Sequence, residues 1–178
     1  HLSTKLTFAN KIVAYIRTDL VTFEDGENQF IAKPAVGQFS VSNTKDFIGE
    51  LTWAGLELKN SEENIAIGTV TVDTKQSIVS GSYLQGTAIL SGDAKFLVES
   101  INYEDVVTNE LFALQKLLFT TSVSVKDDLL ALALAYNAEE IITVGQTFKQ
   151  PNLDVVLTGI DINALKEFNA LLASLPQD

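Results

Sequence analysis

The sequence contains no cysteine and no methionine, and its only histidine is His1. The lack of cysteine excludes disulfides, thiolate metal sites and cysteine nucleophiles. With one histidine at the first position, neither a Ser-His-Asp triad nor a histidine-ligated metal site is expected. Because the chain has no initiator methionine, we expect a fragment of a longer protein and interpret His1 as the remnant of a purification tag.

Basic residues and long apolar runs are also scarce. Lys and Arg number 12 against 23 Asp and Glu, which gives a formal net charge of −11, with the acidic residues dispersed along the chain. Nucleic acids and anionic membrane surfaces attract basic patches, so neither is an expected partner. No apolar stretch reaches the roughly 20 residues of a transmembrane helix. Any membrane tether or export signal is therefore expected outside this sequence.

Hydrophobic residues make up 46% of the chain, enough for the core of a single domain spanning residues 1–178. Most of them alternate with polar residues, which is the period of β-strands. The alternating segments are 5–23, 30–42, 47–60, 64–90, 91–105 and 151–161. Within 24–29, Asp25-Gly26 predicts a hairpin turn, and Lys33-Pro34 predicts the end or break of an edge strand.

The alternation slips by one residue at two glycines. Leu51 and Trp53 occupy odd positions, whereas the apolar residues after Gly55 occupy even ones, and a similar change occurs at Gly68. A glycine at such a slip indicates a β-bulge, which bends a strand. The sequence therefore predicts a mainly β fold with long bent antiparallel strands in a curved sheet or meander.

Residues 127–140, DDLLALALAYNAEE, fit two kinds of element. Ala and Leu are the best helix formers, yet here they alternate as side chains on the two faces of a strand do. A helix would carry leucines around its whole circumference, which suits only a fully buried helix. We therefore expect a strand, with Ala131, Ala133 and Ala135 on one face. These small side chains would let another element, either the C-terminal helix or a ligand, approach the backbone.

Two other segments carry helical spacing. Residues 107–119 fit a helical stripe in their first half and a strand in their second, so we expect a strand for the second half and leave the first open. Residues 161–174 fit an amphipathic helix that Asp161 caps and that Pro176 follows. We expect the apolar side of this helix to pack on the sheet.

Three stretches resemble the YdgA-like family of uncharacterised bacterial envelope proteins. They are VTFEDGENQF (21–30), FIGELTWAGLELKNSEENIAIGTVTVDTKQS (47–77) and LDVVLTGIDINALKEFNALL (153–172), where a Leu-rich strand leads into a helix opened by Asp161, Ala164 and Leu165. The similarity covers most of 20–172 as a pattern. It implies a β-rich periplasmic region of a Gram-negative envelope, often tethered to the inner membrane by an N-terminal segment missing here, and it transfers no catalytic residue.

Residues suited to catalysis are few. The chain has no Walker loop, no GxGxxG turn and no Gly-x-Ser-x-Gly elbow. Adjacent carboxylates could serve glycoside hydrolysis, but each pair falls at an expected loop or strand end, where solvated charge explains it. These pairs are Glu24–Asp25, Glu62–Glu63, Asp127–Asp128 and Glu139–Glu140. We therefore expect no enzyme, no catalytic residue, no metal site and no cofactor.

Two functions remain, and both are binding functions. The free edges or the acidic face of the sheet could bind a protein partner or a second copy, which would make the chain a structural or interaction module of the cell envelope. Alternatively, a concave apolar face could hold a lipid or another apolar ligand. For that face the sequence nominates Ala131, Ala133, Ala135 and the single tryptophan, Trp53, which equally fits a core position. We favour the interaction module.

Overall fold

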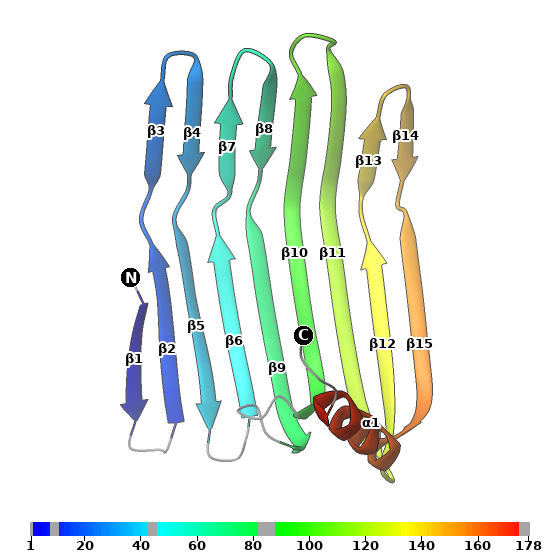
Figure 1. The fold of residues 1–178 in the computed structure, drawn as a ribbon. Coiled ribbons are helices and arrows are strands. Elements are labelled where there is room, and N and C mark those ends of the chain that lie inside the picture. The colour runs from blue at the N-terminus through cyan, green and yellow to red at the C-terminus, as the bar shows by residue number, and fades with distance from the viewer. Residues whose placement is uncertain (1, 8–10, 43–45, 82–87, 175–178) are drawn as a thin grey trace.

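The computed structural model describes residues 2–7, 11–42, 46–81 and 88–174. In these residues fifteen strands form one antiparallel sheet, and one helix follows the last strand (Figure 1). The elements are β1 (Leu2–Thr7), β2 (Lys11–Thr18), β3 (Val21–Asp25), β4 (Asn28–Ala32), β5 (Ala35–Ser42), β6 (Asp46–Trp53), β7 (Leu56–Lys59), β8 (Glu63–Ile67), β9 (Val70–Ser80), β10 (Ile89–Asp105), β11 (Glu110–Lys126), β12 (Leu129–Asn137), β13 (Glu140–Thr143), β14 (Gln146–Lys149), β15 (Asn152–Asp161) and α1 (Ile162–Ser174). The predicted mainly β fold class is confirmed.

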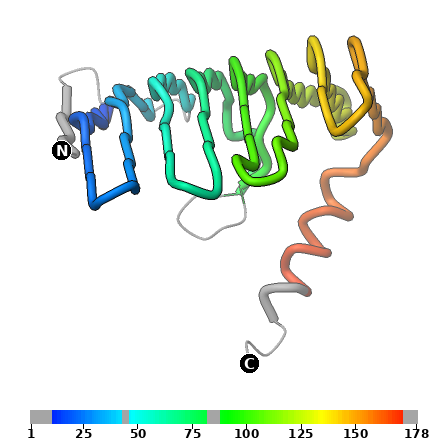
Figure 2. The backbone as a smooth tube through the Cα atoms, turned by 90° about the horizontal axis from the view of Figure 1, so that it is seen from above, coloured from blue at the N-terminus to red at the C-terminus, as the bar shows by residue number. Residues whose placement is uncertain are grey.

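The strands β10 and β11 run through the whole height of the sheet. Each has 17 residues, which corresponds to about 55 Å at about 3.3 Å per residue. The other strands lie end to end in two rows beside this pair. The lower row has the order β1-β2-β5-β6-β9-β10-β11-β12-β15, and the upper row has the order β3-β4-β7-β8-β10-β11-β13-β14. Seen from above, the strands form a single layer, and α1 leaves it to one side (Figure 2).

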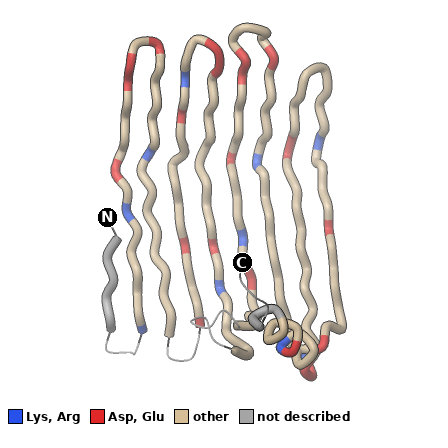
Figure 3. The backbone as a smooth tube through the Cα atoms, viewed as in Figure 1, with Lys and Arg blue, Asp and Glu red and all other residues tan. Residues whose placement is uncertain are grey.

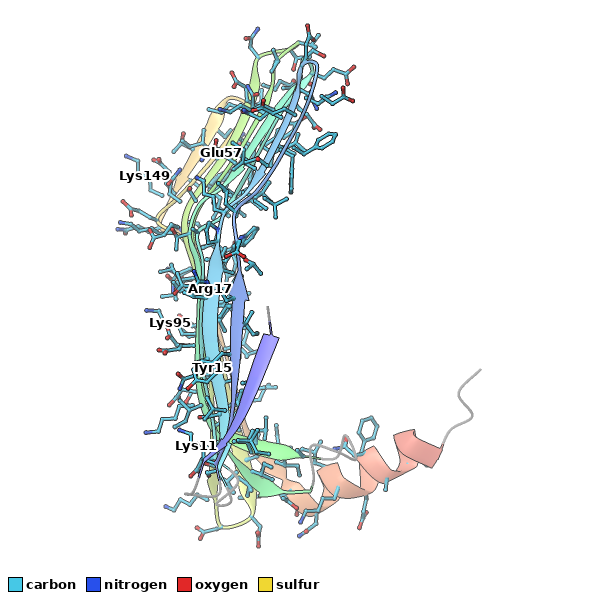
Figure 4. The ribbon with its side chains drawn as sticks, turned by 90° about the vertical axis from the view of Figure 1, so that its left-hand side faces the viewer. Lys11, Tyr15, Arg17, Glu57, Lys95 and Lys149 are labelled. Carbon is cyan, nitrogen blue, oxygen red and sulfur yellow. The ribbon has the colours of Figure 1, made fainter. Side chains whose placement is uncertain are left out.

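The two rows meet at a bend, visible from the side in Figure 4. We call this line the crease; it includes residues 33–34, 54–55, 68–69, 99–100 and 115–116. Backbone hydrogen bonds join neighbouring strands along it: the amide of Ala54 donates to the carbonyl of Pro34 (2.9 Å), and the amide of Gly68 donates to the carbonyl of Ser100 (2.8 Å). The crease is therefore a bonded line of bulges rather than a gap in the sheet.

Side-chain alternation is reset at the crease in each strand. In a regular strand one residue separates two successive apolar residues on the same face. At the crease, two residues separate the last apolar residue on one side of the bend from the first apolar residue on the other side. The spacing recurs in Trp53–Leu56, Ile67–Val70, Val98–Ile101 and Leu114–Leu117. Gly55, with φ +103°, and Lys116, with φ +49°, adopt the left-handed backbone that such bulges need. The bent strands predicted from the slips at Gly55 and Gly68 are confirmed.

The position of Pro34 corrects one expectation. Lys33 and Pro34 separate β4 from β5, but neither is an edge strand: β4 lies between β3 and β7, and β5 lies between β2 and β6. Proline has no amide hydrogen to donate, which normally confines it to sheet edges. It is tolerated inside this sheet because it lies at the crease, where the regular ladder is interrupted and its carbonyl still accepts from Ala54.

The remaining local predictions can be compared directly with the elements. The Asp25-Gly26 turn joins β3 and β4, with φ +59° at Gly26. Residues 129–137 form strand β12 as expected. The first half of 107–119, which fits a helical stripe, holds a turn and then the start of β11. Asp127 and Asp128 both have positive φ, the signature of a type I′ hairpin turn. Their carboxylates are thus accounted for by a turn.

The helix α1 is anchored only at its start. The Asp161 carboxylate accepts hydrogen bonds from the amides of Asn163 (2.7 Å) and Ala164 (3.2 Å), which caps the helix as predicted. Ile162 is 2% exposed and packs in a small core with Ile89 and Leu130. Beyond its first turns the helix runs away from the sheet (Figure 4).

Ion pairs lie close to the crease. The Lys33 ammonium is 2.7 Å from the Glu57 carboxylate, which also has Lys59 at 3.8 Å. The hydrogen bond and the charge of Lys33 hold the pKa of Glu57 below its usual value. At β11, the Lys116 ammonium lies 2.6 Å from the Glu139 carboxylate, and this carboxylate raises the pKa of Lys116. In each pair a residue of one strand meets a residue of the connection beside it: Glu57 of β7 meets Lys33, and Lys116 of β11 meets Glu139.

We predict that Gly55→Ala lowers the free energy of unfolding by about 3 kcal/mol. An added Cβ would collide with the carbonyl oxygen of Ile67 and lie 2.8 Å from that of Gly68, and φ at residue 55 is +103°. Urea denaturation measures the loss. The matched control is Gly26→Ala, also at positive φ but with no atom within 4 Å of the added Cβ, which should cost about 1 kcal/mol. Equal losses would show that close packing at the crease does not matter.

The ion pair between Lys33 and Glu57 predicts that the stability of the fold depends on pH. Because the folded-state pKa of Glu57 is lowered, the pair contributes stability above the unfolded pKa of the carboxyl and loses it as the pH falls through the folded pKa. In an NMR titration, Lys33→Met should return the pKa of Glu57 towards its ordinary value. Lys59→Met should change it less, because Lys59 is more distant. An unchanged pKa in the Lys33 variant would contradict this assignment.

Candidate functional site

The sheet has one face that α1 touches, and the contacts of the helix identify it. Ile162 and Leu165 belong to a cluster that includes Leu130 and Leu132 of β12. Alternation along β12 then places Leu134 on the same face. The helix projects from this side, and the upper half of the sheet leans towards it (Figure 4). We call this side the concave face and the other the convex face.

Strand register extends the concave face across the lower half. Residues directly opposite one another in antiparallel strands lie on the same face. One row across the sheet is Ile16, Gly37, Leu51, Val72, Phe96, Phe119, Tyr136 and Leu153, and a second is Ile12, Val41, Phe47, Gln76, Gly92, Val123, Leu132 and Leu157. Both rows are almost entirely apolar.

The apolar face continues above the crease. Lys95 in the lower half and Lys149 in the upper half project from the same, convex side (Figure 4). Alternation therefore places Phe148 on the concave side. Its row is Phe148, Ile141, Leu114, Ile101, Ile67, Leu56, Ala32 and Val21, and the row nearer the hairpin tips is Phe112, Tyr103, Ile65, Leu58, Phe30 and Phe23. The reset at the crease thus keeps apolar side chains on one side throughout.

Much of this face is open to solvent. Phe119 is 38% exposed at the centre of the sheet, Phe23 is 58% exposed near one hairpin tip, and Leu153 is 61% exposed on β15. The helix packs only on the lower end of the sheet through Ile162 and Leu165, so it leaves the rest of the face uncovered. Soluble monomers rarely expose contiguous apolar patches beyond a few hundred Å².

Glycines and aromatic rings make part of this face flat. The Phe39 ring lies so close to Gly49 that a Cβ at residue 49 would collide with it. Phe39 also stacks on Phe47, with ring centroids 5.9 Å apart and planes at 19°. The Phe39 ring therefore lies over the backbone of Gly49, at a place where a side chain would have no room.

The concave face has almost no charge. The four rows given above contain no Asp, Glu, Lys or Arg, and Tyr103 is one of their few titratable groups. Burial, and then the carboxylates of Asp105, Glu63 and Glu110, raise the pKa of Tyr103, so it stays neutral at physiological pH. Figure 3 shows charged residues at the hairpin tips, at the lower end of the sheet and at positions within the strands. Those within the lower strands, such as Glu50 and Lys95, alternate with the concave residues and so lie on the convex face.

The convex face carries a broad groove of a different kind. Its volume is about 770 Å³, and its lining mixes charges of both signs with small residues. Glu50, Asp73, Lys95 and Asp154 come from one row across the strands. The whole lining contains three Lys and four Asp or Glu, so the groove has little net charge for an ionic ligand.

The four residues nominated from the sequence do not share a face. Ala133 and Ala135 line the convex groove, and alternation places Ala131 on the same side. Trp53 lies on the concave side, in line with Leu51, at the crease, where its indole nitrogen donates to the carbonyl of Lys33 at 3.0 Å. The expectation that α1 fills the alanine side is wrong, since α1 packs on the leucines of β12.

The residues of β12 on the concave face are therefore its leucines and not its alanines. The sequence already indicated this second set, because Leu132 and Leu134 alternate with the alanines. Alternation shows that a strand has two different faces, but it does not show which face lies on the inside of a bend.

Other chemistry is sparse in the part of the chain that the structure describes. Those residues include no group of three or more His, Cys, Asp or Glu placed to hold a metal ion. They also include no helix with the length and apolar character needed to span a membrane. The carboxylate pairs lie at turns or strand ends. Asp105, at another strand end, accepts hydrogen bonds from the amides of Thr108 and Val107, which lowers the pKa of its carboxyl.

Comparison with known proteins gives a family. Searches of curated proteins and of solved structures gave no match. The family described as "Bacterial protein of unknown function (DUF945)" matches residues 1–178, the whole of the chain. The architecture described above is a bent fifteen-stranded sheet with an exposed apolar face. Because the family match spans the whole sequence, the chain belongs to this bacterial family of unknown function.

Proposed function

We propose that this domain is a non-enzymatic interaction module that buries its concave face against an apolar surface of a protein partner. The observation that carries the proposal is the continuous apolar face, uninterrupted by charge from β14 and β15 to β2 and β3, which α1 leaves exposed. Exposed apolar area of this extent favours association, because burial contributes about 25 cal/mol for each Å² removed from water.

The size of the face favours a protein over a single small apolar ligand. Nine strands at about 4.8 Å spacing make the lower half about 40 Å wide, and the sheet is about 50 Å tall. A typical protein interface buries about 800 Å² on each partner, which this face can supply. Ligand sites usually enclose most of the ligand surface. The concave face is an open wall with α1 at its lower end, so it does not enclose a lipid tail.

Two features support a role without catalysis. The carboxylate pairs lie at turns or strand ends, away from the centre of either face, and the convex groove is broad and of mixed charge. The resemblance to YdgA-like envelope proteins adds a place for the module, the periplasm, where an apolar sheet face could meet other envelope proteins. This location is part of the proposal.

Site-specific photo-crosslinking in bacterial cells tests the proposal. A photoreactive phenylalanine analogue at Phe96 faces the concave side, whereas the same analogue at the adjacent Lys95 faces the convex side, and both positions are exposed. We expect discrete protein adducts from position 96, identified by mass spectrometry and found in the periplasmic fraction, and none from position 95. The pair forms a matched control because only the face differs.

The other outcomes are equally informative. Adducts with fatty-acyl chains alone at position 96 would replace the protein partner by a lipid, the alternative occupant of this face. Equal labelling at positions 95 and 96, or none at either, would contradict a specific role for the concave face.

A further inference from the structure

The strand β15 is a long edge with little of the usual protection against pairing. In the residues that the structure describes, it pairs only with β12. Nine of its ten residues are exposed. Edge strands usually avoid association through short length, charges, Pro or bulges. In NLDVVLTGID there is neither Lys nor Pro, and Asp154 is the one charge before the bulge at Gly159. At the opposite side of the sheet the edge strands are shorter: β1 of the lower row has six residues, and β3 of the upper row has five and carries Glu24 and Asp25.

We propose that β15 pairs antiparallel with β15 of a second copy, around a two-fold axis that passes beside Val155 and perpendicular to the sheet. Two limits define the paired segment. Pro151 has no amide hydrogen to donate, and at Gly159 the backbone has φ +75° within a region where the register with β12 shifts. Residues 152–158 are therefore the regular part of the edge.

The residues of this segment are self-complementary in one register. With Val155 opposite itself, Leu153 faces Leu157 of the second copy, and Asp154 faces Val156. A register centred on Asp154 would oppose two like charges, which destabilises a pair. Registers centred on Leu153 or Val156 would pair fewer residues, because they reach Pro151 or Gly159 sooner.

Charge beyond the segment agrees with the antiparallel arrangement. Each end of the segment that is followed outwards by Lys149 lies beside the end of the second copy that carries Asp161, twice by symmetry. Lys149 projects from the convex side (Figure 4), and alternation places Asp161, the partner of Leu129, on the same side. The helix α1 turns back beneath the sheet, away from the outer side of β15 (Figures 1 and 2). The edge is therefore clear for a second strand.

A perpendicular axis has a consequence for the proposed binding face. It keeps both concave faces on the same side, so the dimer presents one apolar wall that is twice as wide. Axes in the plane of the sheet would place the two walls on opposite sides. The pairing stands independently of what covers the wall, because it uses the backbone edge of β15.

Cysteine crosslinking tests the register in a chain that has no native cysteine. Directly opposed residues in antiparallel strands have Cα atoms about 4.5–5.5 Å apart, within reach of a disulfide. Val155→Cys should therefore form a dimeric disulfide under mild oxidation. Leu153→Cys and Leu157→Cys should each remain uncrosslinked alone, because each residue lies about 13 Å from its own copy, but an equimolar mixture should form the heterodisulfide.

Sedimentation equilibrium provides the second measurement. The unmodified chain should show a concentration-dependent dimer, and Val155→Lys should weaken dimerisation by about tenfold or more, because two lysines would face each other. Val21→Lys, on the exposed edge strand β3, is the matched control and should leave dimerisation unchanged. A monomer at all concentrations would overturn the proposal. A dimer that crosslinks through Leu153 alone, or not at all through these positions, would overturn the register.

Discussion

The apolar pattern of the strands slips by one residue at the crease, so an uninterrupted strand would send its apolar residues to the convex side in one half of the sheet. Each strand that crosses the crease instead inserts one extra residue, and hydrogen bonds such as that from Ala54 to Pro34 hold these insertions at one level. The bend and the side-chain reset are therefore one event. The concave apolar face, the position of α1 and the proposed interface all depend on it.

The same constraint explains why the molecule has so small a core. A single layer cannot bury one of its faces by itself, and α1 contributes only a small cluster around Ile162 and Leu130. The longest ladder joins β10 with β11 through the whole height of the sheet. Apolar side chains such as Phe119 and Leu153 remain exposed. An open edge at β15 and an open face thus have a common origin in the single-layer architecture.

Local patterns in the sequence predicted most of the fold. Alternation, the Asp25-Gly26 turn, the slips at Gly55 and Gly68 and the cap at Asp161 each predicted the element that the structure contains, because each reflects backbone geometry within a few residues. The site was predicted only in part. Trp53 lies on the concave side, but the alanines of β12 line the convex side, since the pattern of one strand contains no information on which way its neighbours bend it.

By itself, the sequence determined which residues are extended, where the alternation slips and that β12 has a face of leucines and a face of alanines. Only the tertiary structure decided that the slips of separate strands align into one crease, that the leucines lie inside it, and that Pro34 is inside the sheet rather than at its edge. The reason is physical. Periodicity and turn chemistry act between neighbours in the chain, whereas curvature and the choice of covered face depend on pairing between strands far apart in sequence.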